Sequence, residues 1–107
     1  MNKRLPYDAV IFTSLLSKQV KEYLEMSNKM EKLARLQDGF LGMNSVRNTI
    51  GITISYWDSL EAIKNWKQKS AHLIAQEKGK SDWYSWYNVK ICKVECEFEF
   101  EFEFEIN

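Results

Sequence analysis

The order of two hydrophobic periodicities along the chain constrains its fold most. Residues 7–16 are rich in β-branched and aromatic side chains, as expected of a strand. Apolar residues of 17–37 then recur at helical spacing, with Lys and Glu between them, and Asp38 and Gly39 provide a stop signal. Residues 40–47 and 50–57 return to strand-like patterns on either side of a short connection, in the manner of a hairpin.

A second helical stretch and a last strand follow. Asp58 and Glu61 are spaced as a capping box, in which the Asp side chain caps the helix and the Glu reaches back. A second short helix is expected at residues 70–78, residues 81–87 form an aromatic link of uncertain form, and a strand begins at Val89. The order β-α-β-β-α-β predicts a ferredoxin-like α+β fold, a four-stranded antiparallel sheet with the helices on one face.

The composition is that of an ordinary globular domain. At 107 residues the chain is long enough for one hydrophobic core, and 15 basic residues balance 15 acidic ones. Zero net charge without a basic stripe argues against nucleic acid as a partner, because phosphate binding depends on clustered Lys and Arg. No apolar run reaches the length of a membrane span, and the first residues lack the apolar core of a signal peptide. We therefore expect one domain over residues 1–95, with no nucleic acid and no membrane as partner.

The cysteines bear on the cellular compartment. Cys92 and Cys96 are the only two, and on one strand they would be about 13 Å apart at ~3.3 Å per residue, too far for a disulfide. This spacing favours a reducing, cytoplasmic location. One histidine and no Cys-x-x-Cys pair argue against a structural zinc site, so we expect no metal.

The end of the chain is a strict two-residue repeat. Within residues 96–107 Glu alternates with Phe from position 97 to position 105, which places the phenyl rings on one face of an extended chain and the carboxylates on the other. We interpret this low-complexity extension as a β-strand that pairs with the sheet or with the tail of a partner. The alternative is a tail without a structural role, attached to a domain that is complete at Glu95. Because the apolar phase slips between Ile91 and Cys92, we expect a β-bulge at residues 91–93.

The first strand is apolar on both of its faces. Because the helices cover only one face of the sheet, several apolar side chains stay exposed on the other face. Burying a face of several hundred Å² at ~25 cal/mol per Å² would contribute several kcal/mol before the costs of association. We therefore predict a homodimer that forms through the outer face of the sheet. The alternative is a monomer with some exposed apolar residues, which is common.

Several segments carry a resemblance to a known family. Residues 54–67 read Ile-Ser-Tyr-Trp-Asp-Ser-Leu-Glu-Ala-Ile-Lys-Asn-Trp-Lys, residues 72–79 read His-Leu-Ile-Ala-Gln-Glu-Lys-Gly, and Trp83 and Tyr84 follow. With Met-Ser-Asn-Lys-Met at 26–30 and Gln-Asp-Gly-Phe-Leu-Gly at 37–42, this pattern resembles the antibiotic biosynthesis monooxygenase (ABM) family. The resemblance does not extend to the tail.

The resemblance implies a dimeric α+β barrel with one pocket per protomer, between the sheet and the helices. It implies a monooxygenase that oxidises small aromatic substrates, such as phenols or anthrones, with O2 and with no cofactor, because the carbanion of the substrate supplies the electrons. Such chemistry requires a flat apolar slot, a group that takes or shares a phenolic proton, and donors for the resulting oxyanion.

Seven residues are candidates for these roles. The catalytic candidates are His72, Trp66 and Tyr84, and the substrate-binding candidates are Asn65, Gln76, Trp83 and Phe12. His72 is the one histidine, the residue type best suited to proton transfer near neutral pH. Trp66 lies on the helix that the family uses as a pocket wall, and Gln76 and Tyr84 could donate hydrogen bonds to an oxyanion. Aromatic side chains at these spacings are nevertheless more often part of a core or an interface.

Two other functions stay open. The same slot could hold an aromatic metabolite without turnover, in a non-catalytic binding module. A haem-binding or haem-degrading relative is the other option. The haem-degrading branch of the family uses an Asn on the first strand and a His about ten residues after the helix Trp, and this chain has Thr13 and Gln76 at the corresponding positions.

Overall fold

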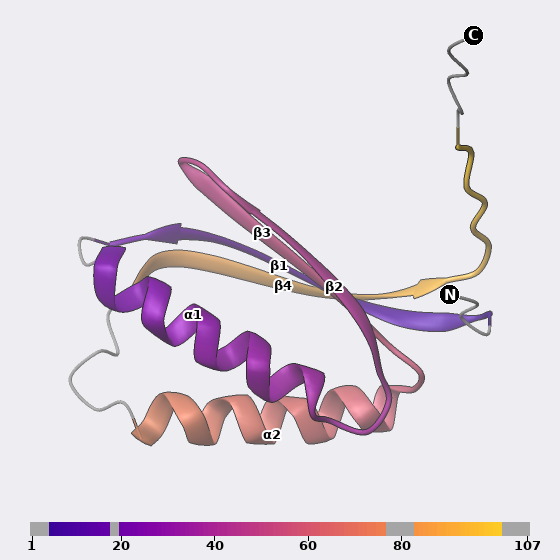
Figure 1. Ribbon diagram of the computed structural model, residues 1–107, viewed down its shortest axis with the longest axis horizontal. Helices are drawn as coiled ribbons and strands as arrows, with labels where there is room; N and C mark the ends of the chain where they lie inside the picture. Colours follow the sequence, from indigo (N-terminus) through magenta and orange to yellow (C-terminus); the bar gives the residue numbers. More distant parts are fainter. Residues whose placement is uncertain (1–4, 18–19, 77–82, 102–107) are drawn as a thin grey trace, which may run out of the picture.

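The computed structural model describes residues 5–17, 20–76 and 83–101, with the backbone alone for residues 20–22 and 74–76. The described part follows the predicted order, as β1 (Tyr7–Leu16), α1 (Val20–Arg35), β2 (Phe40–Arg47), β3 (Ile50–Trp57), α2 (Leu60–Gln76) and β4 (Tyr84–Val94). The sheet is antiparallel with the strand order β2-β3-β1-β4, and both helices lie on one face of it (Figure 1). The predicted ferredoxin-like α+β fold is confirmed.

Strand alternation divides the sheet into a helix-facing side and an outer side. On β1, Val10 packs into the core under the helices, whereas Ile11 and Leu15 lie on the outer side. The outer side carries four large exposed apolar side chains, at Val46 (68%), Ile50 (50%), Ile52 (37%) and Trp86 (47%). The apolar outer side that the first strand predicts is therefore present, and within one chain these four side chains are exposed, whereas Tyr7 and Ala9 on the same side of β1 are buried.

Two core clusters lie between the sheet and the helices. The first core cluster consists of Ala34, Trp57, Ala62 and Ile63. Trp57 is wholly buried, and its indole N–H donates to Ser55 Oγ at 2.9 Å. The second core cluster consists of Tyr23, Met26 and Trp83, with Leu73 of α2 and Tyr84 of β4 packed against it. Because α1 contributes to both clusters, it connects the two halves of the core.

The turn after α1 fixes how α2 begins. Gly39 has a φ of 86°, a conformation that favours glycine, and the N–H of Asp58 donates to its carbonyl at 2.8 Å. A Cβ at Gly39 would lie 2.6 Å from Cβ of Ala62, so the turn packs directly on the first turn of α2. The stop signal predicted at Asp38 and Gly39 is therefore confirmed.

The helices differ from expectation in three details. α1 ends at Arg35, two residues before the predicted end. The cap of α2 is Ser59 and not Asp58, since Ser59 Oγ accepts from the N–H of Ala62 at 3.1 Å. The two helices expected after residue 58 are one helix that runs to Gln76, because the junction contains no Gly or Pro. The hydroxyl of Ser70 donates to the Lys67 carbonyl at 3.0 Å, within the same helix. The end expected at residue 78 lies outside the described residues.

The last strand begins earlier than predicted, at Tyr84, so that part of the aromatic link belongs to β4. The β-bulge expected at residues 91–93 is wrong, because the pairing of β1 with β4 is regular from Trp86 to Val94. The apolar phase slips there because the strand carries apolar groups on both of its sides. The irregularity lies instead opposite Leu15 and Leu16, where Ser85 is the additional residue and its hydroxyl donates to the Leu15 carbonyl at 3.4 Å.

Residues 95–101 leave the sheet after β4 and are not in a strand (Figure 1). Their recorded attachment is a hydrogen bond from the Tyr7 hydroxyl to Glu97 Oε1 at 2.7 Å, while Phe98 and Phe100 are 93% and 83% exposed. Over these residues the tail does not extend the chain's own sheet, and its pairing with a partner stays a prediction. In the described part of the chain, neither helix is long and apolar enough to cross a membrane.

Candidate functional site

Five aromatic rings gather on the helix-facing side of β1 and β4. We call Phe12, Tyr23, Trp83, Tyr84 and Tyr87 the aromatic cluster. The ring of Phe12 stacks against that of Tyr87, with centroids 5.6 Å apart, and meets Tyr84 edge to face at 5.3 Å. Tyr23 of α1 contacts Tyr84 at 5.6 Å and Trp83 at 6.1 Å. The cluster therefore joins the second core cluster to the surface of β4.

The aromatic cluster is open toward the edge of the sheet. Tyr87 is 60% exposed, and Val89 and Ile91, on the same side of β4, are 47% and 55% exposed. This half of the sheet is less covered because the helices pack mainly against β2 and β3. A flat apolar ligand could lie against these side chains with its plane along the strand.

Arg47, at the end of β2, extends toward the aromatic cluster. Its guanidinium donates to Ser14 Oγ and, at 3.4 Å, to the Tyr23 hydroxyl, and it lies 5.0 Å from the centroid of the Tyr23 ring. The side chain crosses the strand β3 at Gly51, where a Cβ would overlap the guanidinium. Glycine at position 51 is therefore what lets the cation lie over the sheet.

The Tyr84 hydroxyl is a donor at neutral pH. Burial raises the pKa of Tyr84 well above its usual range, and Tyr23 raises it further through its charge and through a hydrogen bond, whereas Arg47 lowers it. Tyr84 therefore keeps its proton at neutral pH, so it can donate a hydrogen bond to an oxyanion but does not supply a base.

The structure brings three of the seven predicted site residues together. Phe12 and Tyr84 contact each other, and Trp83 packs in the adjoining second core cluster. The indole Nε1 of Trp83 is buried and has no hydrogen-bond acceptor among the described residues. Tyr23, Ser14 and Arg47 were not predicted. Arg47 ends its strand at a loop, and no feature of the sequence shows that its side chain turns back across Gly51.

The α2 candidates lie elsewhere. Trp66 stacks on Trp57 in the first core cluster, with centroids 5.7 Å apart. His72 is exposed. Six residues of helix separate it from Trp66 by about 9 Å along the axis and about 120° around it, so the two side chains leave α2 in different directions. The side chain of Gln76 lies outside the described residues.

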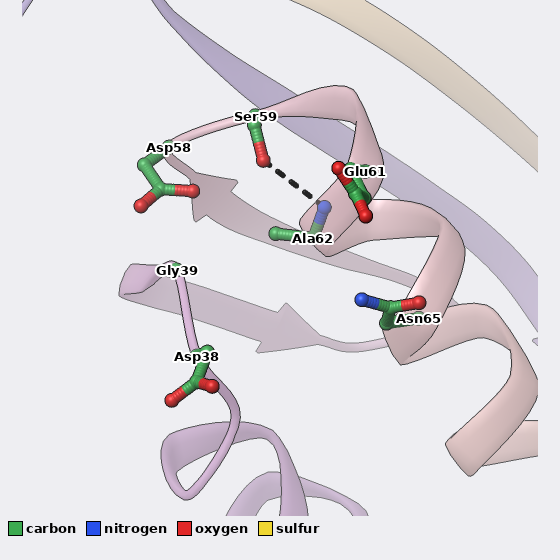
Figure 2. A pocket seen from close by; sticks show the side chains of 7 residues that line it. All are labelled: Asp38, Gly39, Asp58, Ser59, Glu61, Ala62 and Asn65. Carbon is green, nitrogen blue, oxygen red and sulfur yellow. Dashed lines mark hydrogen bonds between the residues drawn. The ribbon is translucent and has the colours of Figure 1, made fainter.

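Asn65, the remaining candidate, lines a surface pocket of about 170 Å³ at the start of α2 (Figure 2). The other lining residues are Asp38, Gly39, Asp58, Ser59, Glu61 and Ala62. Three carboxylates make this pocket acidic, which does not suit a ligand that becomes an oxyanion. Among the described residues, no three His, Cys, Asp or Glu side chains are grouped so that they could hold a metal ion.

Fold and site together define a ferredoxin-like α+β protein with an aromatic surface between its sheet and its helices. Uncharacterized protein YqjZ of Bacillus subtilis strain 168 is 48% identical over 92 residues, which cover 84% of this chain and 81% of YqjZ. No family model matches the chain.

Solved structures share the fold at low sequence identity. SnoaB, a cofactor-independent oxygenase from Streptomyces nogalater, superposes with a TM-score of 0.64 at 10% identity, over 81% of this chain and 91% of that chain. A candidate antibiotic biosynthesis monooxygenase from Nitrosomonas europaea gives a TM-score of 0.64 at 11% identity, over 90% and 94%. The chain belongs to the family of YqjZ, and it shares the ferredoxin-like α+β fold of SnoaB and of the Nitrosomonas europaea protein.

Proposed function

We propose that this protein is a cofactor-independent monooxygenase that oxidises a small planar phenol- or anthrone-like substrate with O2 on the aromatic cluster. The observation that carries the proposal is the contact of Phe12 with Tyr84 and Tyr87, which joins flat apolar surfaces to phenolic hydroxyls. The oxygenase SnoaB has the same fold, which supports a reaction of this class.

Anthrone is the probe substrate. Loss of a proton from the ring carbon gives an enolate, whose electrons reduce O2 and form a carbon–oxygen bond. The second oxygen atom leaves as water, so anthrone and O2 give anthraquinone and H2O. Tyr84 and Tyr23 stabilise the enolate oxygen by donating hydrogen bonds, and Phe12 and Tyr87 hold the ring plane.

The α2 residues remain part of the proposal. Leu73 packs against the second core cluster, so the adjacent His72 lies near its margin, where it could take a proton from a substrate that arrives from solvent. Trp66, Asn65 and Gln76 would contribute through α2 and not by contact with the aromatic cluster, Trp66 from the first core cluster and Asn65 from the surface pocket. We also propose a homodimer through the outer side of the sheet, and a cytoplasmic location, which the free and exposed Cys92 and Cys96 support.

Anthrone oxidation under air tests the proposal. We expect anthraquinone to form faster with protein than in buffer, with one O2 consumed per product. Tyr84→Phe should lower kcat by about tenfold or more, as expected for the loss of one oxyanion donor. Tyr56→Phe, on the outer side of the sheet, is the matched control and should keep the full rate. Binding without turnover would contradict the enzyme proposal and identify a binding protein.

A further inference from the structure

The charge of Arg47 is not neutralised within the described structure. Its guanidinium contacts Ser14 and Tyr23, both of which are uncharged, and neither recorded ion pair includes it. Arg47 is itself half-buried, on the helix-facing side of the sheet. A partly desolvated cation without a counter-ion is unfavourable, and an anion that binds beside it removes that cost.

The guanidinium is held in place before any ligand arrives. Ser14 is wholly buried and accepts from Arg47 through its hydroxyl and, at 3.5 Å, through its carbonyl. The Tyr23 ring packs against the guanidinium, and the absence of a side chain at Gly51 leaves its path free. A planar cation with its orientation fixed loses little entropy when it binds a carboxylate or phenolate oxygen.

The hydroxyl of Tyr23 adds a second donor. Its oxygen accepts from Arg47 at 3.4 Å, and its ring contacts that of Tyr84 with centroids 5.6 Å apart. Because the oxygen already accepts from Arg47, the proton of Tyr23 can be donated to an anion beside the guanidinium. The buried indole N–H of Trp83, whose ring meets that of Tyr23, is a further donor, and it has no acceptor in the part of the chain that the structure describes. Around the Tyr23 hydroxyl, hydrogen-bond donors therefore outnumber acceptors.

We propose that Arg47, Tyr23 and Trp83 form an anion subsite, which selects planar aromatic ligands that carry an anionic oxygen. The aromatic cluster holds the ring, and the subsite holds the carboxylate or the phenolate. This inference deepens the proposed function by naming its substrate class, acidic aromatics, and it rests on that function only for the location of the ligand. Binding of an acid that O2 does not oxidise tests it separately from catalysis.

The test compares two probes of equal shape, naphthoate and the neutral naphthamide, by isothermal titration calorimetry. We expect the wild-type protein to bind naphthoate about tenfold more tightly, in line with a charge-assisted pair at a partly buried site. Arg47→Met should remove this preference and retain naphthamide binding. Gly51→Ala should do the same with the charge unchanged, because the new Cβ displaces the guanidinium. The control is Arg35→Met, which removes an exposed arginine that is paired with Glu31.

The outcomes separate the two proposals. A preference for naphthoate that Arg47→Met and Gly51→Ala both abolish establishes the subsite, even if anthrone is not oxidised. Equal affinities for the two probes in the wild-type protein, or no binding of either, overturn the subsite. A preference that survives Arg47→Met, or that Arg35→Met abolishes equally, overturns it as well, because the discrimination would then come from general surface charge.

Discussion

Trp66 stacks on Trp57, with ring centroids 5.7 Å apart and ring planes inclined by 24°. Trp57 is wholly buried, and the half-buried Trp66 packs against the first core cluster. The residue chosen from the sequence as a wall of the ligand slot therefore has a packing contact of its own. Its role in binding remains a proposal.

Replacement of Trp66 should reveal both roles. Trp66→Ala should lower the free energy of unfolding by about 2–4 kcal/mol, because it removes a large ring from the core. Trp66→Phe should cost less, since it keeps a ring on Trp57. Urea unfolding measures stability, and calorimetry with naphthamide measures binding. The exposed α2 residue Lys64, replaced by Ala, is the control. If the urea midpoint of Trp66→Ala equals that of the wild-type protein, the stacking of Trp66 on Trp57 does not stabilise the fold and the prediction is wrong.

The outer side of the sheet should be a dimer interface. Ile52→Glu places a charge at the exposed centre of this side and should convert the dimer to a monomer without unfolding it. Leu24→Glu, at an exposed position of α1, should leave the dimer intact. Sedimentation measures the mass, which for the wild-type protein should be twice that of one chain. A wild-type monomer at micromolar concentration would contradict the prediction.

The tail should act through the partner rather than through its own chain. Deletion of residues 97–107 should weaken dimerisation by about tenfold, because Phe98 and Phe100, which are exposed in one chain, would be buried against the partner. Glu97→Gln keeps both rings and should dimerise almost normally. Sedimentation equilibrium gives the dimer dissociation constant. An unchanged constant after deletion would show that the domain is complete at Glu95.

The Tyr7–Glu97 hydrogen bond gives a dependence on pH. This bond, and then burial, raise the pKa of Tyr7 from 10.0 to about 12. Because the folded pKa is the higher one, the stabilisation is complete below about pH 10 and is lost as the pH rises through about 12. Stability should therefore fall less steeply in Tyr7→Phe than in the wild-type protein over this range, although Tyr84, whose pKa is also raised, contributes to both. Equal slopes in urea unfolding would contradict the assignment.

Most of the fold was predictable because the periodicities are strong and agree with local signals. β1, β2 and β3 begin and end where the sequence predicts. The errors lie where local signals compete. Asp58 and Ser59 are both good caps, and in the fold the backbone of Asp58 is bonded to Gly39 while the Ser59 hydroxyl caps α2. The bulge was misplaced because β4 is apolar on both sides at an uncovered edge.

The site was only partly predictable. Residue type identified Phe12, Trp83 and Tyr84, which the structure brings together. Helical phase could already separate His72 from Trp66. The position of Arg47 depends on a side chain that crosses a neighbouring strand, and hence on a glycine two strand positions beyond a turn. Such tertiary contacts leave no period in the sequence.

The central claim is that a planar aromatic ligand binds on the helix-facing side of β1 and β4. The most direct test is a titration of isotope-labelled protein with anthraquinone carboxylate, followed by amide chemical shifts. The largest shifts should fall at Phe12, Tyr84 and Tyr87. Shifts centred on the acidic pocket at Asp58 and Glu61, shifts confined to the outer side, or no shifts at all would contradict the claim.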